Sequence, residues 1–269
     1  MAQSNGWDFG AGQTNNGSVG FGGSINGISQ GIYEESSTQK GPLGSKLAFD
    51  DGREFVYTLS AAAITIGLVC ANDYSNGLLA ETDNFTVSAT AGNDYFSLTG
   101  AGSEFSTTSQ FYAGSYIVFT DGTGAGQYYR IKDHTDASSD KVTFYLYDDL
   151  VTAPSSDTDI IIQGNPYGAA ITADRTGEDG TTDTFPIGVN PIAISSGYYF
   201  WLQTKGICAV KFDGGTTATP HYGMELVVSG NHDGQVEAKL DADDGARTVG
   251  YHASPTGDDN TYISMYLDL

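Results

Sequence analysis

The fold of this chain is decided by residues 116–131, which read YIVFTDGTGAGQYYRI. The glycines at positions 122, 124 and 126 give this stretch a likeness to a phosphate-binding loop. Such a loop, however, leads into the N-terminus of a helix and usually ends in a Lys-Ser or Lys-Thr pair. Residues 127–131 instead continue in a β pattern, so we interpret the glycines as a hairpin turn. This interpretation favours a β-rich scaffold over nucleotide chemistry.

The composition favours the same fold class. The 269 residues suffice for one large or two small domains, and they include 17 tyrosines, 13 phenylalanines, 36 glycines and 7 prolines. Strand-forming aromatics between clusters of Gly, Asn, Asp and Ser are typical of β proteins with many tight turns. No window of about 11–18 residues shows a helical period. We therefore predict an all-β fold built from β-sandwich or barrel-like modules.

The charge limits the classes of partner. The formal net charge is -22, with only 11 Lys and Arg residues, so we expect a solvated acidic surface and no nucleic-acid partner. The N-terminus lacks a secretory pattern, and no apolar run approaches the roughly 20 residues that cross a bilayer. We expect synthesis in a cytoplasm and no membrane partner.

The first 39 residues differ in composition from the rest of the chain. They are rich in Gly, Asn and Ser and lack the apolar content for a core of their own. One hypothesis is a flexible tail, and the other is an extended arm that becomes ordered against a partner. The isolated aromatics Trp7, Phe9 and Phe21 favour the arm, because an arm that folds on binding needs side-chain anchors.

The remaining sequence predicts a core β domain with an inserted module. The core comprises residues 40–83 and 168–269, and the inserted β module comprises residues 84–167. Within the module, candidate strands recur about every ten residues, as in a sandwich or barrel. The expected strands are 54–59, 64–71, 85–88, 95–98, 116–120, 127–133, 141–147, 160–163, 191–194, 198–204, 207–212, 225–228, 235–239, 248–253 and 262–267.

The sequence predicts, for two strands, which side chains share a face of the sheet. Residues 141–147 should place Val142, Phe144 and Leu146 on one face, with Thr143, Tyr145 and Tyr147 on the other. The consecutive aromatics of residues 198–201 should likewise point to two faces. One of those faces would be core, and the other would meet a partner subunit or, as an alternative, stack on a sugar.

The two cysteines carry no metal signature. Cys70 and Cys208 each lie in an apolar strand pattern, and their spacing fits no zinc motif. We expect buried free thiols, with a disulfide as the open alternative.

Catalytic and metal motifs are weak throughout. No Gly-x-Ser-x-Gly elbow occurs, the four histidines show no metal-ligand spacing, and 33 acidic residues would form some carboxylate pair by chance. We predict no enzyme and no cofactor. Calcium is the ion that two acidic loops would suit best, although neither loop meets the EF-hand pattern. These loops contain Asp241, Asp243, Asp244 and Gly245, and Asp174, Glu178, Asp179 and Asp183.

Several stretches, taken together in their order, resemble head-associated proteins of tailed bacteriophages. The first pair is residues 43–46 (LGSK) with 51–57 (DGREFVY), which leads into an apolar strand. A second set resembles a β-module of phage virion proteins and consists of residues 124–127, 130–131, 150–154 and 157–159. A third set resembles the "GV … aGxxWxQxxG" segment and the ending of the same proteins. It consists of residues 187–189, 194–198, 201–206, 234–236, 249–251 and 265–269.

The resemblance covers roughly residues 40–269 and implies a capsid decoration, or cement, protein. Such a protein would bind the major capsid protein on the virion surface, commonly as a homo-oligomer, with a trimer favoured. The family contributes no catalytic residues. One alternative is a tail or fibre module that binds host surface glycan, which predicts clustered exposed aromatics in residues 84–167. Another is a carbohydrate-active enzyme, for which the sequence nominates no residue.

Overall fold

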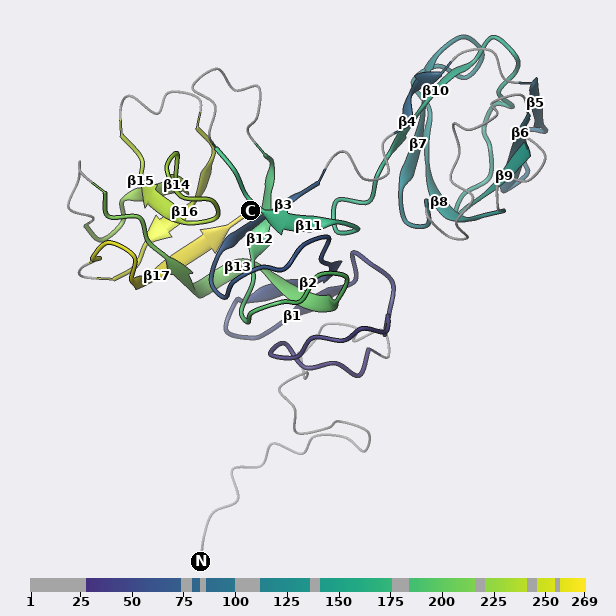
Figure 1. Ribbon diagram of the computed structural model, residues 1–269. Coiled ribbons are helices and arrows are strands. Elements are labelled where there is room, and N and C mark those ends of the chain that lie inside the picture. Colours follow the sequence, from purple (N-terminus) through teal and green to yellow (C-terminus); the bar gives the residue numbers. More distant parts are fainter. Residues whose placement is uncertain are drawn as a thin grey trace, which may run out of the picture. The chain divides into compact units, whose positions relative to one another are not determined.

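The computed structural model describes residues 28–73, 79–82, 86–99, 112–135, 141–175, 184–215, 221–240, 246–254 and 257–269. Within these ranges the chain forms seventeen β-strands and no helix, joined by turns and loops (Figure 1). The strands make two sheets, one of which curls into a half-barrel. The prediction of an all-β fold with sandwich-like or barrel-like modules is confirmed.

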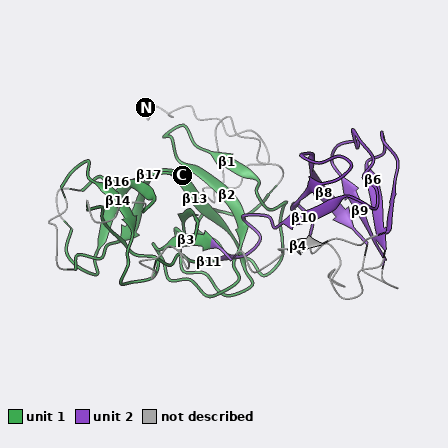
Figure 2. Cartoon of the chain, turned by 90° about the horizontal axis from the view of Figure 1, so that it is seen from above, with its two compact units in different colours: residues 1–71, 171–269 green, residues 72–170 purple. Residues whose placement is uncertain are grey.

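The chain divides into two compact units, which Figure 2 shows in separate colours. Unit 1 comprises residues 1–71 and 171–269, and unit 2 comprises residues 72–170. Unit 2 begins at the end of strand β3 (Val69–Asn72) and ends at the start of β11 (Ala170–Thr172), which is the neighbour of β3 in the sheet. Entry and exit of the insertion therefore lie side by side. The backbone N–H of Asp73 donates to the carbonyl of Ala169 at 2.8 Å.

Unit 1 contains a ten-stranded sheet with the path β11-β3-β12-β13-β17-β16-β14-β15, and β1 and β2 join it through β13. The long strand β13 is the centre of this sheet, because it pairs with β2, β12 and β17. The further bounds are β1 (Lys46–Ala48), β2 (Glu54–Leu59), β12 (Pro186–Val189), β13 (Tyr199–Lys211), β14 (Glu225–Val228), β15 (Val236–Ala238), β16 (Thr248–His252) and β17 (Tyr262–Asp268).

The N-terminal end of β13 is covered by a segment of its own chain. Trp201 is buried in a cluster with Ile28 and Ile32, and its Nε1–H donates to the carbonyl of Gln30 at 2.8 Å. The side chain of Gln30 also accepts the hydroxyl of Tyr57 at 2.9 Å. The expected arm of residues 1–39 therefore overlaps unit 1 from Ile28 onward.

The packing of residues 28–32 over Trp201 changes the expectation that one face of residues 198–201 meets a partner. Instead, Phe200 and Trp201, which point to opposite faces of β13, are both buried within unit 1. Three further strand boundaries were wrong. The expected strands 198–204 and 207–212 fall almost wholly within one strand, and residues 191–194 form a turn with an isolated bridge. The expected strand 64–71 begins only at Val69, because residues 64–68 belong to a turn.

Gly206 explains the uninterrupted β13. It lies in the gap between the expected strands 198–204 and 207–212, yet the structure places it inside β13 with φ at 87°. Its neighbourhood contains a register shift between Gln203 and Lys205 against β2. A glycine in the left-handed region allows a bulge to bend a strand without ending it.

Unit 1 is built around two equivalent turns that sequence reasoning did not identify. Residues 60–67 connect β2 to β3, and residues 190–197 connect β12 to β13. Ile64 and Ile194 lie at equivalent positions of the two turns and exchange both backbone hydrogen bonds, each at 2.9 Å. The flanking strands pair in equivalent register: Leu59 with Tyr199, and Val189 with Val69. The two β-turn-β segments are therefore related by a local two-fold axis. Four residues are identical at this spacing: Phe55 and Phe185, Ala63 and Ala193, Ile64 and Ile194, and Gly67 and Gly197.

The fully buried Asn190 holds the turn pair in place. Its Oδ1 accepts the N–H of Leu68 at 2.9 Å, and its Nδ2 donates to the carbonyls of Thr65 at 2.8 Å and Ile192 at 2.7 Å. Ser60 occupies the equivalent place in the other turn, where its hydroxyl donates to the carbonyl of Ala62. The side chain of Asn190 thus bonds to both turns, whereas the side chain of Ser60 bonds only within its own turn.

Asn190→Ala should lower the free energy of unfolding by about 3 kcal/mol, because buried backbone groups would lose their partners. The matched variant Ser60→Ala should cost only about 1 kcal/mol, since it removes one local bond. Urea unfolding followed by circular dichroism measures both values. Equal effects of the two variants would contradict the role assigned to Asn190.

Unit 2 holds the seven-stranded half-barrel, in the order β4-β10-β7-β8-β9-β6-β5 (Figure 1). Strands β7, β8, β9 and β10 alternate between buried and more exposed side chains, and the buried apolar set forms one cluster. The bounds are β4 (Leu79–Thr82), β5 (Thr86–Ala89), β6 (Tyr95–Thr99), β7 (Tyr116–Asp121), β8 (Tyr128–His134), β9 (Lys141–Leu146) and β10 (Asp159–Gln163).

The hairpin predicted from residues 116–131 is confirmed. Strands β7 and β8 pair antiparallel, with Tyr116 opposite Arg130. All three glycines of the connecting turn have positive φ values, between 68° and 87°. Glycine adopts this backbone region at low cost, which is why the turn contains so many.

Candidate interaction faces

One face of the sheet in unit 1 exposes a contiguous set of large apolar side chains. Ile207 on β13 pairs with Tyr266 on β17, which in turn pairs with Tyr251 on β16, so the three side chains lie on one side. They are 52%, 42% and 41% exposed. Tyr262, two positions before Ser264 on β17, continues the set, and its hydroxyl donates to the carbonyl of Ile66 at 3.3 Å. We call Ile66, Ile207, Tyr251, Tyr262 and Tyr266 the open face.

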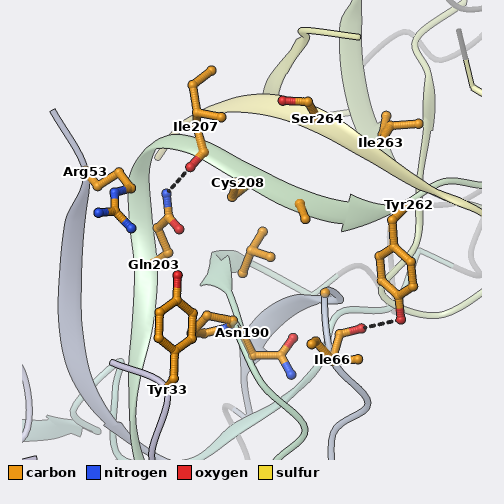
Figure 3. Close-up of a pocket in the computed structure, with 14 residues that line it drawn as sticks. Tyr33, Arg53, Ile66, Asn190, Gln203, Ile207, Cys208, Tyr262, Ile263 and Ser264 are labelled. Carbon is orange, nitrogen blue, oxygen red and sulfur yellow. Dashed lines mark hydrogen bonds between the residues drawn. The ribbon is translucent and has the colours of Figure 1, made fainter. Parts of the chain in front are cut away.

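A groove of about 620 Å³ lies at the β13 end of the open face (Figure 3). Figure 3 shows Ile207, Tyr262 and Ile66 around the same cavity as Tyr33 and Gln203. Tyr33 belongs to the N-terminal segment that covers Trp201. The groove is therefore placed where this cover ends and the open part of the sheet begins.

The polar walls of the groove are fixed by hydrogen bonds within the chain. Nε2 of Gln203 donates to the carbonyls of Lys205 at 3.0 Å and Ile207 at 2.9 Å. Arg53 is held by Asp51, at 2.7 Å between Nε and Oδ2. Because these side chains are already bonded, the groove is preformed.

Cys208 also lines the groove, but it is not an activated thiol. Cys208 and Cys70 are both free and buried, as the sequence led us to expect. Burial raises the pKa of each thiol to about 12, so both stay protonated at neutral pH.

Unit 2 carries a second exposed set, made almost entirely of tyrosine. Tyr95 and Tyr145 face each other across β6 and β9, with ring centroids 6.3 Å apart. Tyr116 and Tyr128 lie on β7 and β8, with centroids 6.5 Å apart. Tyr147, just beyond β9, lies over Arg130, whose Cζ is 5.1 Å from the ring centroid. We call these five tyrosines the tyrosine face. The predicted outward direction of Tyr145 and Tyr147 is confirmed.

The cations of unit 2 accompany the tyrosines. Its sequence contains three, Arg130, Lys132 and Lys141, and all occupy outward positions of β8 and β9. Among the described residues, none of the three forms an ion pair. In unit 1, Lys205 pairs with Asp268 at 3.7 Å, whereas Lys40, Lys46 and Lys211 also form no ion pair among the described residues.

A Ser-His-Asp cluster occurs in unit 1, but its order is not that of a catalytic triad. Oδ2 of the buried Asp213 accepts the hydroxyl of Ser229 at 2.5 Å and also lies 3.1 Å from Nδ1 of His232. The hydroxyl of Ser229 accepts the N–H groups of Asn231 and His232. In a triad the histidine lies between serine and aspartate, whereas both bind one carboxylate oxygen here. The cluster fixes the loop between β14 and β15.

The cluster sets the ionisation of Asp213. Burial alone would raise the pKa of this carboxyl, but hydrogen bonds from Ser229, His232 and the N–H of Gly215 favour the ionised form and lower the pKa below its usual value. The folded chain therefore binds this proton less readily than the unfolded chain. The stabilisation is complete above the unfolded pKa of about 3.9 and is lost as the pH falls through the folded pKa.

Asp213→Asn should reduce stability at neutral pH by about 2 kcal/mol, because the charge-assisted hydrogen bonds are lost. The variant should also unfold with a shallower dependence on pH below about 4 than the unchanged protein does. Thermal unfolding across this pH range measures both effects. Asp233→Asn, at an exposed position of the adjacent turn, is the control. Parallel pH curves for Asp213→Asn and the unchanged protein would contradict the assignment.

Most residues named from the sequence as candidate sites lie outside the described residues. This holds for the anchors Trp7, Phe9 and Phe21. It also holds for all calcium candidates except Asp174, namely Glu178, Asp179, Asp183, Asp241, Asp243, Asp244 and Gly245. In the described part of the chain, no group of three or more His, Cys, Asp or Glu side chains is placed to hold a metal ion. The described ranges likewise contain no helix that is long and apolar enough to span a membrane.

Comparisons of the chain with models of protein families, with curated proteins and with solved structures gave no match.

Proposed function

We propose that this chain is a head-associated structural protein of a tailed bacteriophage, which decorates the capsid and stabilises it through surface contacts. The open face is the observation that carries the proposal. Scattered apolar residues are normal on protein surfaces, whereas a contiguous exposed set marks a contact with another molecule. The fixed groove beside the open face adds a shape that a partner side chain can fill.

The partner follows from the resemblance in sequence. The motifs in residues 43–57 and 187–206 resemble those of capsid decoration proteins, which implies the major capsid protein as the partner. The residues of the second motif build β12, β13 and the turn between them. In this proposal the open face binds the capsid, and the chain acts as a homo-oligomer, with a trimer favoured. Many shallow contacts, repeated over the lattice, then add up to tight binding.

The N-terminal residues have a separate place in the proposal. Trp7, Phe9 and Phe21 serve as anchors that reach a neighbouring subunit or the capsid protein. Because the segment from Ile28 onward is packed into unit 1, the reaching part is confined to residues 1–27. The proposal includes no catalytic step, cofactor, nucleic acid or membrane.

The double variant Ile207→Glu with Tyr266→Glu should occupy capsids at least roughly tenfold less than the unchanged protein, because the contact would bury unpaired carboxylates. The measurement is the copy number per purified virion, by quantitative mass spectrometry. Tyr222→Glu is the matched control, because this exposed tyrosine lies outside the open face.

Both altered residues are exposed, so the melting temperature of the double variant should stay close to that of the unchanged protein. Normal capsid occupancy by a folded double variant would overturn the assignment of the open face. Equal loss for Tyr222→Glu would overturn its specificity.

A second candidate function is a tail or fibre module that binds host surface glycan. That hypothesis predicts clustered exposed aromatics in residues 84–167, and the tyrosine face lies within this range. Tyrosine suits such contacts, because its ring offers an apolar surface and its hydroxyl a polar tip. The tyrosine face therefore favours glycan binding by unit 2, as an activity separate from the contacts of the open face.

A further inference from the structure

The tyrosine face combines two features that point to one class of ligand. Four of its five rings are exposed, and Arg130 and Lys132 lie among them. We propose that the tyrosine face binds an acidic polysaccharide whose carboxylates are separated by neutral sugars. This proposal rests on the glycan-binding candidate and names its ligand and the residues that recognise it.

The rings supply the apolar half of the site. Tyr128 is 68% exposed and Tyr147 is 53% exposed, so both present large ring surfaces to solvent. The pair Tyr95 and Tyr145 is held in cross-strand register by β6 and β9. Tyrosines on strands lose little conformational freedom on binding, because their backbone is already fixed. The face therefore offers stacking surfaces for successive sugar rings.

The cations supply the charged half. Arg130 and Lys132 occupy alternate positions of β8, so their side chains point outward beside Tyr128. Nε of Arg130 is buried without a hydrogen-bond partner in the described chain, and its guanidinium lies against the ring of Tyr147. Because Nε is inaccessible, Arg130 would meet a carboxylate through its two terminal nitrogens.

The charge of the whole chain makes this local arrangement significant. The net charge is -22, yet Arg130 and Lys132 lie near each other on β8 without an ion pair among the described residues. A neutral glycan would have no use for them. Asp133 lies opposite Tyr145 on the same face, and Asp148 and Asp149 follow Tyr147, so the positive charge is confined to a narrow strip at Arg130 and Lys132. Such a strip fits widely spaced negative charges.

The same reasoning disfavours a nucleic acid. It carries a charge on every nucleotide and would meet strong repulsion from an acidic protein with few cations at the site. Among the described residues of unit 2, the exposed large apolar side chains are four tyrosines and Val151.

The test measures binding of the purified full-length chain to hyaluronan, which carries one carboxylate per disaccharide, by biolayer interferometry. Dextran serves as the neutral polysaccharide and poly(dT) as the nucleic acid. We expect binding to hyaluronan that weakens as NaCl rises from about 50 to about 500 mM, with little binding to the other two.

Variants then test the named residues. Tyr145→Ala and Lys132→Gln should each weaken hyaluronan binding at least roughly fivefold, and Lys132→Gln should also flatten the salt dependence. The matched controls are Tyr222→Ala and Lys46→Gln, both at exposed positions of unit 1. They should leave the affinity within about twofold of the unchanged protein.

Equal binding to dextran, tighter binding to poly(dT), or no binding to hyaluronan would each overturn the proposal. Insensitivity to Tyr145→Ala and Lys132→Gln would overturn it as well. The assay uses no virions, so its outcome is independent of the open face. A chain that decorates capsids but ignores hyaluronan would lose this inference and keep the first proposed function.

Discussion

The exchange of backbone hydrogen bonds between Ile64 and Ile194 is the contact on which unit 1 depends. It joins two β-turn-β segments that are far apart in the chain, with all of unit 2 between them. Asn190 fixes this junction from one side with three hydrogen bonds. Because the insertion starts and ends on neighbouring strands, its length matters little to this contact. Each doubling of a flexible connection costs only about 0.6 kcal/mol in closure entropy. Unit 2 can therefore carry its own surface without loosening the junction.

The long strand β13 links this junction to function. Its first half is covered by residues 28–33, which bury Trp201, whereas its second half leaves Ile207 exposed beside β17. The groove lies at the transition between these halves. One strand thus contributes both to a buried aromatic cluster and to the open face. Unit 2 follows the same principle, since the outward positions of β8 and β9 carry exposed side chains while their inward positions belong to one core. Both candidate functions are consequently properties of sheet faces.

Much of the fold was predictable, because the alternation of apolar and polar residues along a strand indicates which side chains point inward. Residues 141–147 are the clearest example, with Phe144 buried and Tyr145 exposed. Alternation does not reveal whether a distant segment covers the outward face. Trp201 and Ile207 lie in similar patterns, yet only Trp201 is covered, by residues that sequence reasoning placed in an arm. The break predicted at Gly206 was wrong, because glycine is common both at strand ends and at bulges within a strand. The two turn segments around Ile64 and Ile194 share four identical residues, which are too few for the repeat to be recognised from the sequence.

The central claim is that this chain is a capsid-bound structural protein, and its copy number in purified virions tests that claim most directly. Quantitative mass spectrometry against the major capsid protein gives the ratio. A decoration protein that covers the lattice should be present in numbers comparable to those of the major capsid protein. A few copies per particle would instead place the chain at a vertex, tail or fibre. Complete absence from virions would contradict the account.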